Sequence, residues 1–278
     1  MRPRRKGESV SWSTSHAWET DCIQVPTSET SWPAQKMRKS RWLSARSPLG
    51  KEPLMRVVVA IVLALAGLVW AQPRFPDPAR PVAAIISPAY SDEKTRDSRG
   101  EAERAMDRLG ITPGVRVADV GAGDGYYTVR LARRLGPGAT IYAQDVNAAY
   151  LGRLDARLRR EKIAGVKLVL GAPRDPKLPP GTVDVAILSH MYHEIENPYE
   201  FLYRLRPALA PGARIGIIDL DRRTEHHGTP PALLRCELAA VGYREVAFSS
   251  LAPADGYLAI FVPPAALPPV ESIKPCAP

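Results

Sequence analysis

The chain has 278 residues, of which 45% are hydrophobic and 24% charged, and its formal net charge is +9. This composition excludes a wholly disordered chain and predicts one globular domain. The three cysteines are too few for a disulfide scaffold, and no C-x-x-C pair indicates a structural zinc site. The positive charge is concentrated in residues 1–54, so the rest of the chain lacks the basic stripe typical of nucleic-acid binding.

Residues 1–54 show neither strand nor helix periodicity, and we expect them to be unstructured. A different pattern begins at Met55, with a short positive start, an apolar run from Val57 to Trp70 and a small residue at Ala71. These features are typical of a secretory signal that is cleaved after the small residue. The alternative, a membrane anchor, would need about twenty apolar residues.

Residues 55–71 therefore predict an exported protein, periplasmic or secreted, with a cytoplasmic location as the alternative. The mature chain would begin at Gln72. Because such signals stand at the start of a chain, Met55 is the better initiator, and we hypothesise that residues 1–54 are not translated. The protein would contact a membrane only through the signal segment, if that segment stayed uncleaved.

Proline-rich residues 72–90 predict an extended lead-in to the folded domain. We expect that domain to cover residues 91–264, followed by a C-terminal tail at 265–278. It begins with a helix, indicated by apolar residues at helical spacing, namely Ala102, Ala105, Met106 and Leu109.

Short apolar runs then alternate with amphipathic stretches along the chain. Strands are predicted at residues 116–120, 140–144, 166–170, 183–188 and 214–219. Helices are predicted near residues 125–135, 148–163, 198–209 and 230–241. Continuous apolar strands alternating with helices are typical of a doubly wound parallel sheet, whose two faces are both covered by helices.

The end of the domain breaks this alternation. Two more apolar runs, at residues 244–250 and 257–262, are joined through Pro253-Ala-Asp-Gly256, which is too short to contain a helix. An Asp-Gly pair between two apolar runs indicates a hairpin. The last strand is therefore expected to enter the sheet antiparallel.

The first predicted strand ends in a glycine-rich turn that contains Gly121, Gly123 and Gly125. Glycines let the backbone approach a ligand closely, and the following helix directs its N-terminal amides to the same place. Asp119 precedes this turn, and Asp145 closes the second strand, where a carboxylate can accept hydrogen bonds from both hydroxyls of a ribose. The pattern predicts a ligand that contains a nucleoside.

The run VADVGAGDGYYT at residues 117–128, the acid at Asp145, the turn at 171–175 and the terminal hairpin together resemble the class I S-adenosylmethionine-dependent methyltransferases. The resemblance covers about residues 91–264. It implies an α/β fold with a doubly wound, seven-stranded, mostly parallel sheet and an antiparallel last strand, the Rossmann-like methyltransferase fold. It also implies S-adenosyl-L-methionine as the cofactor.

The resemblance further implies roles for single residues. Asp119 would reach the ammonium group of the cofactor, and Asp145 would hold its ribose. The aminocarboxypropyl chain would lie along the glycines of the first turn, Gly121, Gly123 and Gly125.

The family often places an acid directly after the glycine of the third turn, where it binds the adenine amino group. Here that position is Ala172, and the nearest acid is Asp175, which is therefore the expected adenine contact. Ser189, at the end of the fourth strand, completes the predicted cofactor-binding set.

Methyl transfer from a sulfonium needs alignment and a free lone pair on the acceptor, so one general base can be enough. Histidines lie just after the fourth and fifth strands, and imidazole can take and release a proton near neutral pH. Such loops carry function more often than framework. We predict His193, with Tyr192, as the catalytic residues of the acceptor site.

Other interpretations of these loops stay open. His193 could cap the next helix, and Glu194 and Glu196 could be helix N-terminal charges. Asp219 and Asp221 could contact substrate or be solvated turn residues. The histidines could ligate a metal with Glu194, but their spacing matches neither H-E-x-x-H nor H-x-x-E-H, and no metal site is predicted.

Cys236 and Cys276 could pair in an oxidising compartment. A packed free thiol is the favoured interpretation for Cys236, because nothing in the spacing demands a bond.

The leading hypothesis is a methyltransferase that acts on a small molecule, because no substrate domain is inserted into the chain. A noncatalytic nucleoside-binding protein of the same fold is the alternative, since an exported enzyme would need a supply of a cofactor made in the cytoplasm. Aminopropyl transfer ranks lower because the loop SHMYHE lacks paired acids that could hold a polyamine. A nucleic-acid acceptor is not expected, whereas a protein acceptor stays open.

Overall fold

A computed structural model describes residues 74–86, 92–251 and 256–277. The segment predicted to be unstructured, 1–54, and the predicted signal, 55–71, lie outside the described residues, so both stay predictions. Among the described residues no helix is long and apolar enough to cross a bilayer.

Seven strands form one sheet in the order β3-β2-β1-β4-β5-β7-β6. Strands β1 to β5 run parallel, and β7 lies antiparallel between β5 and β6. Their bounds are β1 Arg116–Val120, β2 Thr140–Asp145, β3 Val166–Leu170, β4 Val183–Ser189, β5 Leu209–Asp219, β6 Arg244–Ser250 and β7 Tyr257–Val262. The predicted doubly wound α/β sheet with an antiparallel last strand is confirmed.

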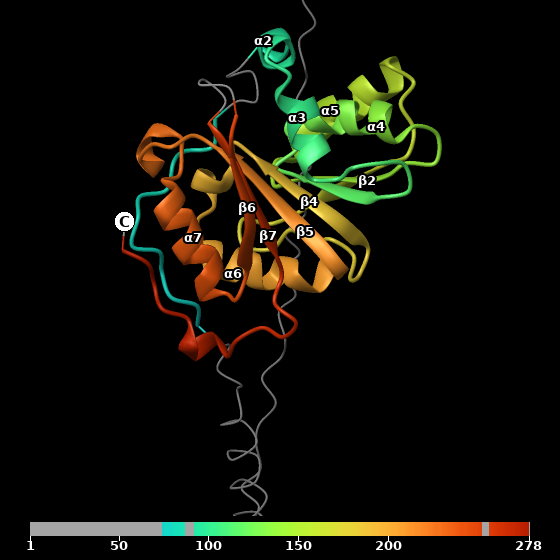
Figure 1. Cartoon of the computed structure of the whole chain (residues 1–278). Coiled ribbons are helices and arrows are strands. Elements are labelled where there is room, and N and C mark those ends of the chain that lie inside the picture. Colours follow the sequence, from blue (N-terminus) through green and yellow to red (C-terminus); the bar gives the residue numbers. More distant parts are fainter. Residues whose placement is uncertain (1–73, 87–91, 252–255, 278) are drawn as a thin grey trace, which may run out of the picture. The chain divides into compact units, whose positions relative to one another are not determined.

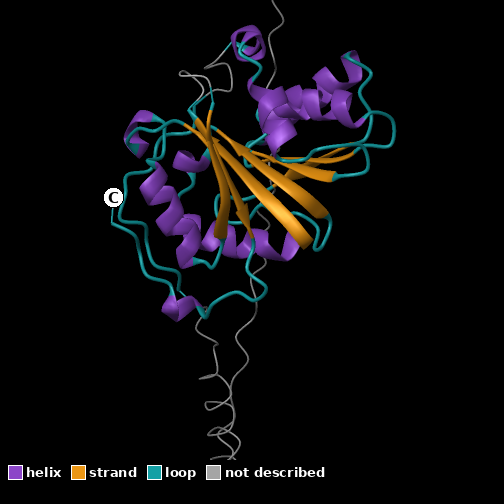
Figure 2. Cartoon of the chain, viewed as in Figure 1, coloured by secondary structure: helices purple, strands orange, loops and turns teal. Residues whose placement is uncertain are grey.

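Helices cover both faces of this sheet (Figure 1 and Figure 2). Helices α3, α4 and α5 lie on one face, and α6 and α7 lie on the other. The helix bounds are α2 Glu93–Ser98, α3 Glu101–Arg108, α4 Tyr126–Leu135, α5 Ala148–Arg160, α6 Pro198–Leu205 and α7 Pro231–Ala240. Because both faces are covered, the central strands β1 and β2 are buried almost throughout.

Helix α6 is shorter than the predicted span of residues 198–209. It ends at Leu205 because Pro207 has no N–H to continue the helical hydrogen bonds. The chain tightens into one 3-10 turn, Arg206–Ala208, and Leu209 already belongs to β5. Strand β5 therefore begins before the predicted residue 214.

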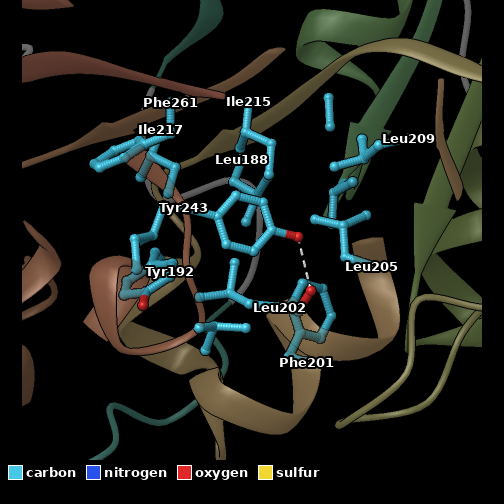
Figure 3. Packing of buried hydrophobic residues seen from close by; sticks show 14 of the residues in the cluster. Leu188, Tyr192, Phe201, Leu202, Leu205, Leu209, Ile215, Ile217, Tyr243 and Phe261 are labelled. Carbon is cyan, nitrogen blue, oxygen red and sulfur yellow. Dashed lines mark hydrogen bonds between the residues drawn. The ribbon is translucent and has the colours of Figure 1, made fainter. Parts of the chain in front are cut away.

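The larger core cluster lies between the sheet and helices α6 and α7 (Figure 3). Tyr243 packs at its centre, and its hydroxyl donates a hydrogen bond to the carbonyl oxygen of Leu202 at 2.8 Å. This bond satisfies the one polar atom of the side chain inside an apolar environment. Tyr192 belongs to the same cluster and is fully buried.

Residues 74–86 run without helix or strand and contact the loop that follows β4. Arg80 is buried, and its Nε lies 2.8 Å from a carboxylate oxygen of Glu237 in α7. Its two terminal nitrogens lie 3.4 Å from the carbonyl oxygens of Tyr192 and His193. The amide of Ala83 donates to the carbonyl of His193 at 3.1 Å. These bonds fix the backbone on which His193 stands.

A disulfide joins Cys236 in α7 to Cys276 in the C-terminal tail. The favoured interpretation of Cys236 as a free thiol is therefore wrong. The tail returns to the domain, where the amide of Cys276 donates to the hydroxyl of Tyr199 at 2.8 Å. This hydrogen bond helps to hold the tail in place. Because the two cysteines are 40 residues apart, the bond should stabilise the fold by roughly 4 kcal/mol through lost freedom of the unfolded chain.

Candidate active site

A cavity of about 550 Å³ lies at the carboxyl ends of β1, β2 and β4. The strand order reverses between β1 and β4, which is where ligands bind in open parallel sheets. Six of the nine predicted site residues line this cavity, namely Asp119, Gly121, Gly123, Asp145, Ser189 and His193. The other three, Gly125, Asp175 and Tyr192, are not among the described residues that line it.

The turn after β1 is fixed to the end of β2 by its own backbone. The amide of Gly121 donates to the carbonyl oxygen of Gln144 at 2.8 Å, and the amide of Gly123 donates to the Asp145 carboxylate at 2.8 Å. Both glycines have positive φ, +72° and +54°, a conformation that a side chain disfavours. The turn thus brings bare backbone to the cavity.

Asp145 retains acceptor capacity toward the cavity. One carboxylate oxygen accepts from the amide of Gly123 and the other from the amide of Asn147, each at 2.8 Å. A carboxylate offers about four acceptor positions, so two remain for a ligand. Two free positions on one carboxylate suit the paired hydroxyls of a ribose.

Asp119 and Gln144 supply two further polar groups in the same cavity. The Asp119 carboxylate accepts from the Thr128 hydroxyl at 2.5 Å, and burial raises the pKa of Asp119 to about 6. A cationic ligand group beside it would stabilise the charged carboxylate. The side-chain nitrogen of Gln144 is buried without a partner among the described residues, and a ligand acceptor atom would satisfy it.

Gly125 and Asp175 lie elsewhere. Gly125 begins α4 with φ +87°, and a Cβ there would stand 2.3 Å from Leu154 of α5, so it lets two helices pack. Asp175 lies in a turn closed by a bridge to Ala172, and its carboxylate accepts from the amide of Lys177 at 2.8 Å. This local bond holds the side chain of Asp175 within its own turn, and the expected adenine contact is not placed at the cavity.

His193 stands in the cavity wall in a defined tautomer. Its Nδ1 lies 3.0 and 3.1 Å from the two carboxylate oxygens of Asp219. A carboxylate can only accept here, so Nδ1 is the donor, and in the neutral imidazole Nε2 carries the lone pair. The side chain of His193 is 2% exposed, and Nε2 has no hydrogen-bond partner among the described residues.

Asp219 is the positioning residue that the sequence left undecided. It is fully buried, which rules out a solvated turn residue. Besides His193, it accepts from the amide of Leu220 at 2.9 Å and from the hydroxyl of Thr229 at 2.7 Å. The sequence contained a hint of this contact, because His193 follows the fourth strand and Asp219 closes the fifth. The structure shows that these two strands are parallel neighbours, so their carboxyl ends meet.

Tyr192 is not brought to the cavity, although it adjoins His193. Both stand on one 3-10 turn, Tyr192–Glu194, whose consecutive side chains point in different directions. The tyrosine ring enters the core shown in Figure 3, where burial, assisted by the charge of Glu237, raises the pKa of Tyr192 well above its usual value. A catalytic role of Tyr192 at the acceptor therefore loses its geometric basis.

Glu194 does line the cavity. One of its oxygens accepts from the amide of Ile86 at 3.2 Å, and burial raises the pKa of Glu194 to about 7. Helix α6 is capped instead by Asn197, whose side chain accepts from the amide of Glu200 at 2.9 Å. The interpretation of His193 as a helix cap is therefore wrong.

An ion pair on the helices before β1 was not predicted from the sequence. Arg96 in α2 lies 2.6 Å from Glu101, donates to the Ser189 hydroxyl at 3.1 Å and stacks 3.6 Å above the ring of Tyr126. Burial alone would raise the pKa of Glu101, but the nearby His190, 3.7 Å away, and hydrogen bonds from Arg96 outweigh it and lower that pKa to about 2. No spacing motif marks Arg96 or Glu101, since such residues are common on exposed helices.

Comparison with known proteins adds independent information. Residues 118–215 match the family model described as a methyltransferase domain. The nocamycin O-methyltransferase of Saccharothrix syringae is 30% identical over 119 residues, which are 43% of this chain and 42% of that protein. The trans-aconitate 2-methyltransferase of Mycobacterium tuberculosis is 33% identical over 144 residues, which are 51% of this chain and 52% of that protein. The chain thus spans about half the length of these curated relatives.

Among solved structures, an S-adenosylmethionine-dependent methyltransferase from Aquifex aeolicus matches 62% of this chain and 97% of its own, with a TM-score of 0.54 and 20% identity. At this identity the likeness is one of fold. It confirms the Rossmann-like methyltransferase fold that the sequence predicts. Residues 118–215 are thus similar to a methyltransferase domain, and they lie within a chain that has the fold of such enzymes.

Proposed function

We propose that the protein is an S-adenosylmethionine-dependent methyltransferase that methylates a small-molecule acceptor. The observation that carries the proposal is one cavity lined both by groups suited to the cofactor and by the buried, unpartnered Nε2 of His193. The names of two relatives contain the small molecules nocamycin and trans-aconitate, which supports a small acceptor here.

The residues present fit the cofactor. Asp119 offers a carboxylate for its ammonium group, and Asp145 has two acceptor positions for its ribose. The turn at Gly121 and Gly123 lets backbone approach the amino-acid portion. The bound cofactor supplies a methyl group on a positively charged sulfur. The sulfur becomes neutral when it leaves, so the leaving group needs no proton from an acid.

The acceptor side needs a lone pair and an exit for a proton. As the bond from acceptor to carbon forms, the carbon–sulfur bond breaks, its electron pair stays on sulfur, and a hydroxyl acceptor must lose its proton. Nε2 of His193 provides a lone pair whose direction is fixed by Asp219. Such a nitrogen can take the proton itself or act on the acceptor through a bound ion.

Substitution Asp145→Ala should weaken binding of S-adenosylmethionine by about 1.5 to 3 kcal/mol, or roughly 10- to 150-fold, because charge-assisted hydrogen bonds to the ribose are lost. Isothermal titration calorimetry measures the change. The matched control is Asp175→Ala, which removes a carboxylate outside the cavity lining and should leave affinity unchanged. Equal affinities of wild type and Asp145→Ala would remove Asp145 from the site.

The same calorimetry, followed by a methyl-release assay over candidate acceptors, tests the proposed activity. Transfer to a small hydroxyl, carboxyl or amine compound is the expected result. Tight cofactor binding without release on any acceptor would favour the noncatalytic nucleoside-binding protein, for which the His193–Asp219 pair would have no role.

We also infer that the protein works outside the cytoplasm. The disulfide between Cys236 and Cys276 supports this location, because such bonds persist in oxidising compartments. Native protein isolated with its thiols blocked should begin at Gln72 and yield the two cysteines as one linked peptide pair. Peptides from residues 1–54, or alkylated cysteines, would contradict export.

A further inference from the structure

We propose that the cavity holds a divalent transition-metal ion on the acceptor side, ligated by His193, Glu194 and His227. The inference rests on the proposed function and deepens it, because it names the group that acts on the acceptor. The potential ligand atoms of these three residues all lie within 4.8 Å of one another, and all three residues line the cavity.

The strongest evidence is the state of His193. A buried ring nitrogen without a hydrogen-bond partner costs free energy unless something binds it. Nε2 of His193 is such an atom among the described residues, and the side chain is 2% exposed. Because Nδ1 donates to Asp219, the lone pair of Nε2 is directed away from that carboxylate.

Of the other two ligands, Glu194 stands on the same 3-10 turn as His193, and His227 lies in the segment between β5 and α7. The ring of His227 meets the ring of His193 edge-on, with centroids 5.5 Å apart. Glu194 follows His193 directly, and one of its carboxylate oxygens accepts from the amide of Ile86. In a tetrahedral site the ligand atoms lie roughly 3.4 Å apart. Side-chain rotations that move each ligand atom by about 1 Å would therefore bring the three atoms to that spacing.

The chemistry of the set indicates the kind of ion. Two imidazoles and one carboxylate suit zinc, iron or cobalt and do not suit magnesium or calcium, which prefer oxygen ligands. The pair of Asp219 and His193 reproduces the carboxylate–histidine arrangement that orients metal-binding imidazoles. Three protein ligands leave one position open.

The open position defines the acceptor class as a compound that presents an oxygen, either a hydroxyl or a carboxyl group. An ion there would favour the ionised form of a hydroxyl, and one proton would pass to the solvent. The oxygen electron pair would then form the bond to carbon while the carbon–sulfur pair returns to sulfur. His193 would serve as a ligand and would not itself accept the proton.

The test uses the full chain, stripped of metal with a chelator. Zn²⁺ is titrated by calorimetry, and Co²⁺ is titrated by its visible absorption, which reports ligand geometry. The wild type should bind one ion per chain. His227→Ala and Glu194→Gln should each weaken binding at least tenfold, whereas the exposed neighbour His226, changed to alanine, should leave it unchanged.

Affinity for S-adenosylhomocysteine provides the check on folding and should be equal in all four proteins. Equal Zn²⁺ affinity in wild type, His227→Ala and Glu194→Gln would overturn the metal site. Full methyl transfer by metal-free protein would also overturn it, and would leave His193 as the direct base of the proposed function. Failure of the proposed function is a separate result, namely that the metal-loaded protein does not bind S-adenosylmethionine.

Discussion

Turnover of the His193→Ala variant should fall roughly 10²-fold or more, while its affinity for S-adenosylmethionine stays that of the wild type. The substitution removes Nε2 of His193, a buried ring nitrogen without a hydrogen-bond partner among the described residues. Asp219 orients that ring through its contact with Nδ1. The lone pair of Nε2 is needed whether it takes the acceptor proton or ligates an ion. The cofactor groups stand on other loops, after β1 and β2, so binding should not change.

The measurement is the initial rate of methyl transfer to an acceptor found in the methyl-release screen, at saturating cofactor. Calorimetry with S-adenosylhomocysteine on the same preparation separates loss of chemistry from loss of binding. His226→Ala is the matched control, because it removes an exposed imidazole outside the cavity lining. A wild-type rate in His193→Ala would leave this residue a structural role only.

The fold could be predicted because its signals are local. Continuous apolar runs of strand length, each followed by a helical stripe, require a sheet covered on both faces. The seven predicted strands are all present, and most of their bounds agree within a residue. The exception is β5, where Pro207 ended the helix early and Leu209 entered the sheet. Packing of that residue outweighed the helical periodicity from which the longer helix was predicted.

The site could be predicted only in part, because sequence spacing reports neighbours along the chain and says little about direction. Adjacent Tyr192 and His193 share one turn yet face the core and the cavity. Asp175 was the nearest acid along the chain, but its backbone bridge to Ala172 keeps it in a turn outside the cavity lining. The pairing of Cys236 with Cys276 depended on the path of the tail. Contacts between residues this far apart along the chain become visible only in the folded structure.

Asp219→Asn tests whether the orientation of His193 matters as much as its presence. The Asp219 carboxylate accepts from His193, Leu220 and Thr229 at once. An amide has one acceptor oxygen and a donor nitrogen in place of the second oxygen. It cannot accept all three bonds, and a nitrogen turned toward His193 would require Nδ1 as an acceptor. The proton would then move to Nε2, and the lone pair in the cavity would be lost.

We therefore expect Asp219→Asn to lower kcat by about 10²- to 10⁴-fold with little change in cofactor affinity. The shape of the side chain is kept, so the free energy of unfolding should fall only by the cost of one unsatisfied buried hydrogen bond, about 1 to 3 kcal/mol. Asp221→Asn makes the same chemical change at an exposed position two residues along and should retain the wild-type rate. If the pH dependence of kcat were the same in Asp219→Asn and wild type, Asp219 would not set the proton position on His193. A merely structural carboxylate would lower stability and leave that profile in place.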